Sequence, residues 1–268
     1  MRVTSFASGS SGNCVFAGSN NTHLLIDAGI SAKKIETCLK ELELNGKDLN
    51  GILVTHEHVD HISGVGVMAR RYGVPIYTTK GTKEALLESK SVGKIEEDLI
   101  QVIEPERDFI IGDLTINATS IWHDAKDPVC YTIQKEKEKV AVVTDLGDYD
   151  EHIIDKLKGS NVLYIEANHD IKMLEVGPYP YYLKQRILGK HGHLSNERSG
   201  QLLAKLWNDQ LEHVFLGHLS KDNNFEELAY ETVKLEVLNS DIGKRVEEVQ
   251  IEVARRDTLS QLIYMNQK

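Results

Sequence analysis

The chain has 268 residues, 41 % of them hydrophobic, which is enough to bury a full core, and we expect a single domain over residues 1–268. Its 41 acidic and 31 basic residues give a formal net charge of −10, which argues against a protein that coats nucleic acid through a large basic surface. A nuclease is not excluded, because bound divalent cations would supply positive charge where a phosphate binds.

The cysteines and the apolar residues bear on the compartment. Cys14, Cys38 and Cys130 are widely spaced and form no CxxC pair, so no disulfide framework is predicted. The amino-terminal residues lack the apolar core of a signal peptide, and nowhere do about 18 apolar residues run together. We therefore expect a cytoplasmic protein with no membrane partner.

Short apolar runs bounded by turn-forming residues alternate along the chain with segments of helical periodicity. The sequence predicts strands at 2–6, 13–17, 23–27, 51–54, 74–77, around 100, at 109–111, 114–121, 129–134, 140–144, 162–166, 214–216 and 249–253. It predicts helices from the cap residue Ser31 to 42, after 61, at 81–88, near 150–157, after 195 and at 224–238. This order indicates a mixed sheet with helices outside it.

Four potential metal ligands follow directly after the apolar run at 51–54, in the sequence Thr-His-Glu-His-Val-Asp-His. A single histidine is more often a core or surface residue than a ligand, but a cluster at the carboxyl end of a buried strand is typical of a site. His56 and His58 can converge on one ion, whereas Asp60 and His61 point elsewhere and can serve a second. The spacing predicts a dinuclear centre.

Three further candidates each stand just past an apolar run. His123 follows the strand predicted at 114–121, Asp145 follows 140–144, and His218 follows 214–216. Their shared position would bring them to one edge of the sheets. A carboxylate has two oxygens that can hold two cations, so Asp145 is the natural bridging ligand.

This ordered pattern, HxHxDH followed by a histidine, an aspartate and a histidine, resembles the metallo-β-lactamase superfamily. The resemblance implies an α/β fold, a four-layer αββα sandwich. It implies that His56, His58 and His123 hold one metal and that Asp145 bridges. It assigns Asp60, His61 and His218 to the second metal, with Asp27 bracing the histidine loop.

A dinuclear site with seven ligands favours phosphodiester over lactam hydrolysis, because two cations activate a phosphodiester well. Gly192-His193-Leu194-Ser195 resembles the histidine motif of phosphodiesterase members, which implies that His193 assists departure of the leaving group. In this mechanism a metal-bridged hydroxide, also held by Asp60, attacks phosphorus.

Further strings narrow the resemblance to the YycJ/WalJ group, regarded as double-stranded DNA 5′ to 3′ exonucleases. They lie at 8–13, 166–170, 177–182 and 217–224. The resemblance implies DNA as the partner, bound at duplex ends, and a role in DNA repair or processing. Histidine and aspartate ligands suit manganese, zinc or iron, with manganese favoured by the carboxylates.

Two alternatives stay open. A small-molecule cyclic or nucleotide phosphodiesterase would share all seven ligands and His193, and pocket depth would separate it from a DNA enzyme. A non-catalytic metal-binding regulatory protein would keep its metal for structure alone, but a structural site needs no open position for a hydroxide.

Overall fold

The computed structural model describes residues 1–265, which divide into two compact units. Unit 1 comprises Met1–Ser120, Ala125–Glu138 and the residues from Arg255 onward, and unit 2 comprises Ile121–Asp124 and Lys139–Ala254. The single domain expected over residues 1–268 stays a prediction.

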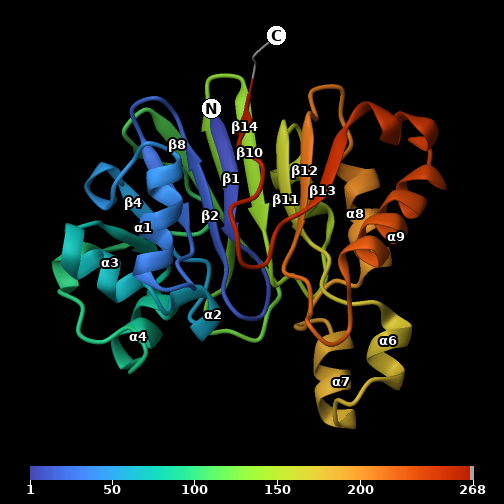
Figure 1. Ribbon diagram of the computed structural model, residues 1–268, viewed down its shortest axis with the longest axis horizontal. Helices are drawn as coiled ribbons and strands as arrows, with labels where there is room; N and C mark the ends of the chain where they lie inside the picture. Colours follow the sequence, from blue (N-terminus) through green and yellow to red (C-terminus); the bar gives the residue numbers. More distant parts are fainter. Residues whose placement is uncertain (266–268) are drawn as a thin grey trace. The chain divides into compact units, whose positions relative to one another are not determined.

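Unit 1 contains a seven-stranded sheet in the order β14-β1-β2-β3-β4-β5-β6 (Figure 1). Its strands pair antiparallel from β14 to β3 and parallel from β3 to β6. The strands are β1 (Arg2–Ala7), β2 (Cys14–Gly18), β3 (His23–Ile26), β4 (Gly51–Leu53), β5 (Ile76–Thr78), β6 (Ile100–Val102) and β14 (Ile263–Tyr264).

The parallel strands of this sheet are joined by helices, as parallel connections require. These helices are α1 (Ala32–Glu41), α2 (Val59–Ile62), α3 (Val65–Tyr72) and α4 (Lys80–Glu88), with short 3₁₀ turns η1 (Gly46–Asp48) and η2 (Glu97–Leu99). Leu39 of α1 and Met68 of α3 are fully buried in one hydrophobic cluster with Ile52 of β4. Strand β4 is thus covered by apolar side chains, and its continuous apolar sequence follows from that burial.

Unit 1 also contains an antiparallel meander, in which β7 pairs with β8 and β8 with β9. These strands are β7 (Phe109–Ile111), β8 (Leu114–Ser120) and β9 (Val129–Lys135). Along β8 buried and more exposed residues alternate, as expected for a strand with one face toward the core.

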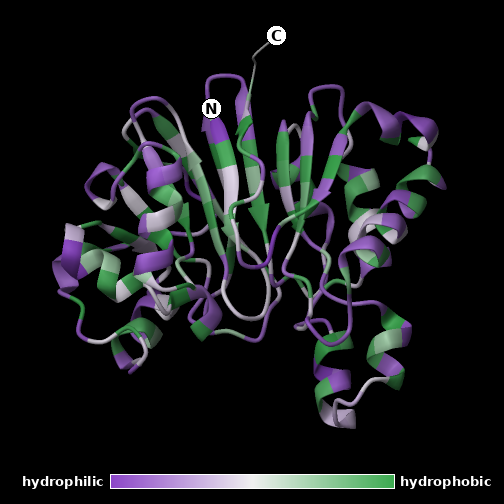
Figure 2. Cartoon of the chain, in the orientation of Figure 1, coloured by the Kyte–Doolittle hydropathy of each residue, from purple (hydrophilic) through white to green (hydrophobic). Residues whose placement is uncertain are grey.

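Unit 2 is built on four parallel strands, β10 (Glu138–Val143), β11 (Val162–Glu166), β12 (His213–Gly217) and β13 (Gln250–Val253). Both central strands, β11 and β12, are buried along their whole length. The helices α5 (Glu151–Leu157), α8 (Asn196–Leu206) and α9 (Glu226–Leu238) flank them, with a 3₁₀ segment η3 (Gly243–Glu248) before β13. Figure 2 shows hydrophobic residues concentrated along the strands and hydrophilic ones on the loops and helix surfaces.

Two short helices absent from the sequence prediction, α6 (Ile171–Val176) and α7 (Tyr181–Leu188), extend away from α8 and α9 (Figure 1). The Gly-Pro-Tyr-Pro segment between them favours a turn, and helices this short are marginal alone. They are held together by Lys184, whose Nζ donates to the carbonyls of Glu175 (2.7 Å) and Gly177 (2.8 Å). The helices and strands that the sequence predicted are present, with ends shifted by a few residues.

Candidate metal centre

The predicted ligand loop of unit 1 begins directly after β4 and runs into the short helix α2. His56 and His61 are fully buried, and His58 occupies the N-cap position of α2. The ring centroid of His56 lies 4.6 Å from that of His58 and 4.2 Å from that of His61. The structure therefore gathers the three imidazoles of this motif in one place.

Asp27 braces this loop, as the sequence suggested. Its Oδ1 accepts from the backbone N–H of Thr55 at 2.8 Å, and its Oδ2 accepts from the Thr55 hydroxyl at 2.8 Å. The same Oδ2 lies 2.7 Å from Nδ1 of His61. Asp27 has a φ of 59°, a left-handed conformation that directs the chain out of β3 at a steric cost of about 1–2 kcal/mol.

Asp60, the fourth member of the loop, is about one quarter exposed. Its Oδ2 lies 3.6 Å from Nε2 of His61 and 3.4 Å from the side-chain nitrogen of Asn13. The backbone of Asn13 also donates to the Asp60 carbonyl at 2.8 Å. Gly29 allows this close approach, because a Cβ there would stand 1.6 Å from the same carbonyl oxygen. The loop that carries Asn13 therefore fixes the position of Asp60.

In unit 2, Asp145 and His218 stand where β10 and β12 end, as predicted. Both are almost fully buried, and both have a φ of 57°. The left-handed conformation is uncommon for residues other than glycine, and it turns the backbone sharply at the end of each of these two strands. In this way two parallel strands present a carboxylate and an imidazole at the same edge.

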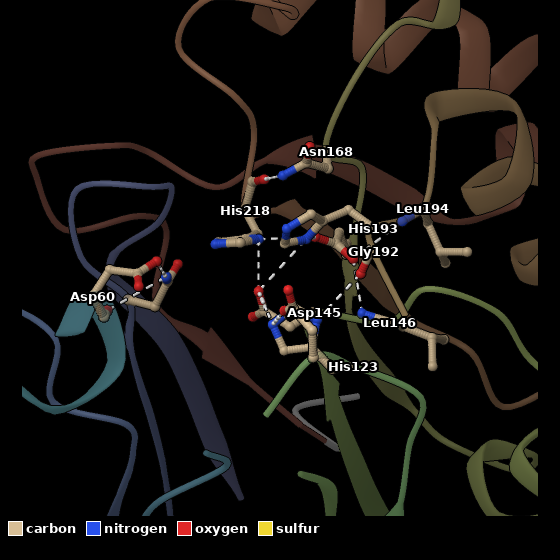
Figure 3. A network of polar contacts seen from close by, with 12 residues as sticks. Asp60, His123, Asp145, Leu146, Asn168, Gly192, His193, Leu194 and His218 are labelled. Carbon is tan, nitrogen blue, oxygen red and sulfur yellow. Dashed lines mark hydrogen bonds and ion pairs between the residues drawn. The ribbon is translucent and has the colours of Figure 1, made fainter. Parts of the chain in front are cut away.

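Figure 3 shows His193 and His218 near Asp145. Both histidines contact Glu166, a residue that the sequence did not assign to the site. Its Oε1 is 2.8 Å from Nδ1 of His193 and 2.8 Å from Nδ1 of His218. Its Oε2 accepts from the backbone N–H groups of Leu146 at 2.9 Å and Leu194 at 3.3 Å. Its position in the sequence could have revealed this role, because Glu166 is an acidic residue at the end of the fully buried strand β11 and needs partners there.

His123 enters the same network. Its Nδ1 lies 3.2 Å from the carbonyl oxygen of Gly192, and its Nε2 lies 3.6 Å from Oδ1 of Asp145. That Asp145 oxygen is also 3.5 Å from Nδ1 of both His193 and His218. Asp145, Glu166, His193 and His218 each place a potential ligand atom within 4.8 Å of the others. Unit 2 thus brings all of its predicted site residues together.

The environment of Glu166 and His193 shifts the pKa of each. Burial alone raises the pKa of the Glu166 carboxyl, but the charge of His193 and the two imidazole hydrogen bonds hold it well below its usual range. Burial lowers the pKa of His193, but the negative charge of Glu166 and its hydrogen bond outweigh this and raise it. Each group of the pair therefore stabilises the charged form of the other.

The donor set fits divalent metal ions, by a feature common to four of the predicted histidine ligands. Metal-binding histidines usually make a hydrogen bond through one ring nitrogen, which orients the other toward the ion. In each of these four rings the nitrogen that makes this contact is Nδ1. Nδ1 of His56 lies 2.9 Å from Thr55 Oγ1, and Nδ1 of His61 lies 2.7 Å from Asp27. Nδ1 of His123 lies 3.2 Å from the carbonyl oxygen of Gly192, and Nδ1 of His218 lies 2.8 Å from Glu166.

Comparison with known proteins agrees with the fold and with the donor set. The family model of the β-lactamase superfamily domain matches residues 22–218, a range that includes every predicted ligand. The chain belongs to this superfamily. Its histidine and aspartate clusters support divalent metal binding.

Within the superfamily the chain is similar to two bacterial proteins named as exodeoxyribonucleases. It is 39 % identical over 247 residues to the exodeoxyribonuclease WalJ of Streptococcus pneumoniae serotype 2, with 92 % of each chain covered. It is also 39 % identical to the exodeoxyribonuclease YycJ of Bacillus anthracis, covering 85 % of this chain and 86 % of that one. The resemblance to the YycJ/WalJ group is confirmed.

Solved structures confirm the αββα fold. The metallo-β-lactamase fold protein YhfI of Bacillus subtilis superposes with a TM-score of 0.68 at 16 % identity, covering 97 % of this chain and 98 % of that one. The short form of human tRNase Z superposes with a TM-score of 0.67 at 14 % identity, covering 99 % of each chain. At these identities the likeness concerns the fold alone.

No helix within residues 1–265 combines the length and the apolar character needed to cross a membrane.

Proposed function

We propose that this protein is a metal-dependent phosphodiesterase that degrades double-stranded DNA from its 5′ ends. The similarity to WalJ and YycJ over nearly the whole chain supports the substrate. The observation that carries the chemistry is the contact between Glu166 and His193, since the carboxylate orients a partly buried imidazole beside the candidate ligands and raises its pKa.

The proposed metal ligands are those that the superfamily pattern implies. His56, His58 and His123 would hold one ion, Asp145 would bridge, and the second ion would be held by Asp60, His61 and His218. Two divalent ions, when bound, supply an activated water and neutralise charge on the phosphate. Manganese is the favoured metal, with zinc or iron as alternatives, because the ligands combine imidazoles with carboxylates.

His193 would act on the leaving group. Its Nδ1 is engaged by Glu166, so the proton it can transfer is the one on Nε2. That proton would pass to the sugar oxygen as the bond from phosphorus to that oxygen breaks, which is general acid catalysis. Glu166 would act as a positioning residue for both His193 and His218.

A small-molecule cyclic or nucleotide phosphodiesterase would use the same residues and is the second candidate. A non-catalytic regulatory metal protein is disfavoured by Glu166, because a structural site does not need an imidazole such as His193 that is oriented beside its ligands and whose pKa is raised. We also propose a cytoplasmic location and a role in DNA repair. The three cysteines are buried and form no disulfide within the described residues, which is typical of a reducing compartment.

The test is digestion of linear duplex DNA, labelled at either end, by metal-depleted protein resupplied with manganese or zinc. Single-stranded DNA, RNA and a small phosphodiester are assayed in parallel. Stepwise metal-dependent release from 5′ ends is expected. It should be lost in Asp60→Asn and kept in a matched control, Asp98→Asn, whose side chain is exposed. Hydrolysis of the small ester alone would move the function to the second candidate.

A further inference from the structure

A cavity of about 280 Å³ lies within unit 2 against His193, on the side formed by α7 and the start of α8. Its wall includes His169, Lys190, His193, Ser195 and Arg198. This volume is close to the lower end, about 300 Å³, of pockets that hold small ligands. None of its lining residues except His193 belongs to the metal ligands or to the proposed chemistry.

His169 supplies the most specific feature of this wall. It is 1 % exposed, and its Nε2 has no hydrogen-bond partner within the described residues. The side-chain nitrogen of Asn168 donates to the carbonyl of His218 at 3.0 Å, so the other Asn168 atom, Oδ1, accepts. Nδ1 of His169 lies 3.3 Å from that Oδ1 and therefore carries the ring proton. Nε2 is then a buried acceptor, which costs free energy unless a donor reaches it.

Burial lowers the pKa of His169 to about 4, so the ring is neutral near pH 7. A neutral ring with its proton on Nδ1 can only accept at Nε2. The group it suits is a hydroxyl or an N–H. The backbone at His169 is held in place, because the N–H of Asn196 donates to the His169 carbonyl at 2.9 Å.

The wall also carries two cations, Lys190 and Arg198, and one carboxylate, Asp148. Nζ of Lys190 lies 3.7 Å from the ring centre of Trp122, a contact that positions the ammonium at the cavity without neutralising it. Arg198 is bonded to the Asp148 carboxylate and lies 4.6 Å from the Tyr149 ring, so much of its charge is already balanced. Lys190 is therefore the principal cation of this pocket.

We propose that this cavity binds the terminal nucleotide that leaves the DNA. Its hydroxyl would donate a hydrogen bond to Nε2 of His169, and its phosphate would be bound by Lys190. The proposal rests on the function proposed above. In a 5′ to 3′ reaction the water oxygen bonds to phosphorus, the bond from phosphorus to the 3′ oxygen breaks, and that oxygen receives a proton. The departing nucleotide then carries a new 3′ hydroxyl and its own 5′ phosphate.

The ligand must combine a hydroxyl donor with an anionic group, and a deoxynucleoside 5′-monophosphate has both. Because His193 lines the same cavity and would protonate the leaving oxygen, the nucleotide that departs is on this side of the reaction. The protein would therefore bind its mononucleotide product and be inhibited by it.

The test is equilibrium binding of deoxyadenosine 5′-monophosphate, with deoxyadenosine and inorganic phosphate as comparison ligands, measured by calorimetry and by intrinsic tryptophan fluorescence. We expect the monophosphate to bind about tenfold more tightly than deoxyadenosine, the usual effect of one charge-assisted contact. Lys190→Ala should remove that difference. The matched control Lys172→Ala, an exposed lysine of α6 that does not line the cavity, should keep it.

His169→Leu should weaken both the monophosphate and deoxyadenosine, with thermal unfolding used to confirm that the variant folds. Binding of the monophosphate that is unchanged in Lys190→Ala would overturn the proposal even if His169→Leu did not fold. The two proposals fail separately. DNA cleavage without Lys190-dependent inhibition by the monophosphate would refute the pocket alone, whereas Lys190-dependent binding without DNA cleavage would refute the exonuclease alone.

Discussion

His193 and His218 share one hydrogen-bond partner, because Nδ1 of each ring lies 2.8 Å from Oε1 of Glu166. One residue is a proposed metal ligand and the other the proposed proton donor. A single buried carboxylate thus fixes which nitrogen of each ring faces the reaction. The two functions of the site are coupled through it, and the following experiments separate them.

Glu166→Gln removes the charge and keeps the size of the side chain. An amide has one acceptor oxygen and one NH2 group, so it cannot accept both from the two rings and from the backbone N–H groups that now bind Oε2. We therefore expect cleavage to fall about 10- to 100-fold, with metal affinity reduced. The measurements are single-turnover cleavage and bound metal by atomic emission. The exposed residue Glu175→Gln serves as control. Wild-type values in Glu166→Gln would mean that orientation of these rings does not matter.

His193→Ala should lower turnover by about 100-fold or more, the range for a lost general acid, while leaving metal content intact. His218→Ala should lose metal as well as activity. Metal analysis and cleavage assays on the two proteins side by side check this. Loss of metal in His193→Ala would assign that residue to the ligands instead. Asp145→Ala should reduce the content of both metals, since it is the proposed bridge.

Asp27→Asn tests the brace of the histidine loop. Asparagine tolerates the left-handed conformation at this position, so the backbone cost stays the same and only the charge is removed. The loss of charged hydrogen bonds to Thr55 and His61 should cost about 2 kcal/mol in the free energy of unfolding, measured by urea denaturation. Asp98→Asn, on the surface, should change this free energy by less than about 0.5 kcal/mol.

The pKa of His169 predicts a dependence of stability on pH. In the folded protein burial lowers this pKa from 6.5 to about 4, so below pH 6.5 the unfolded chain binds a proton that the folded chain does not. The contribution is present above pH 6.5 and is lost as the pH falls toward 4. Between pH 7 and pH 5 it amounts to about 2 kcal/mol.

The measurement is urea unfolding at both pH values for the wild type and for His169→Gln, which cannot titrate. The variant should lose about 2 kcal/mol less than the wild type over this interval. His152→Gln, on the exposed surface of α5, should lose as much as the wild type. Equal losses in the wild type and His169→Gln would show that the histidine is not kept neutral in the folded protein.

The sequence by itself determined which residues are the candidate ligands. Short apolar runs in the sequence predicted β4, β10 and β12. The polar residues that follow these runs, including Asp145 and His218, were found from the same short-range patterns. The family resemblance needed only these ordered residues. Local patterns suffice because a buried strand must be apolar along its length and its first polar residue marks its end.

Only the tertiary structure decided which groups orient the candidate ligands. Glu166 reads locally as the end of a strand, and its role depends on histidines that arrive from two other segments. Strand β14 likewise pairs with β1 at Arg2 and Tyr264, a contact between the two ends of the chain. Helices α6 and α7 depend on the cross-link by Lys184. Such contacts are set by the free energy of burial and pairing in the folded chain, which no local window of sequence contains.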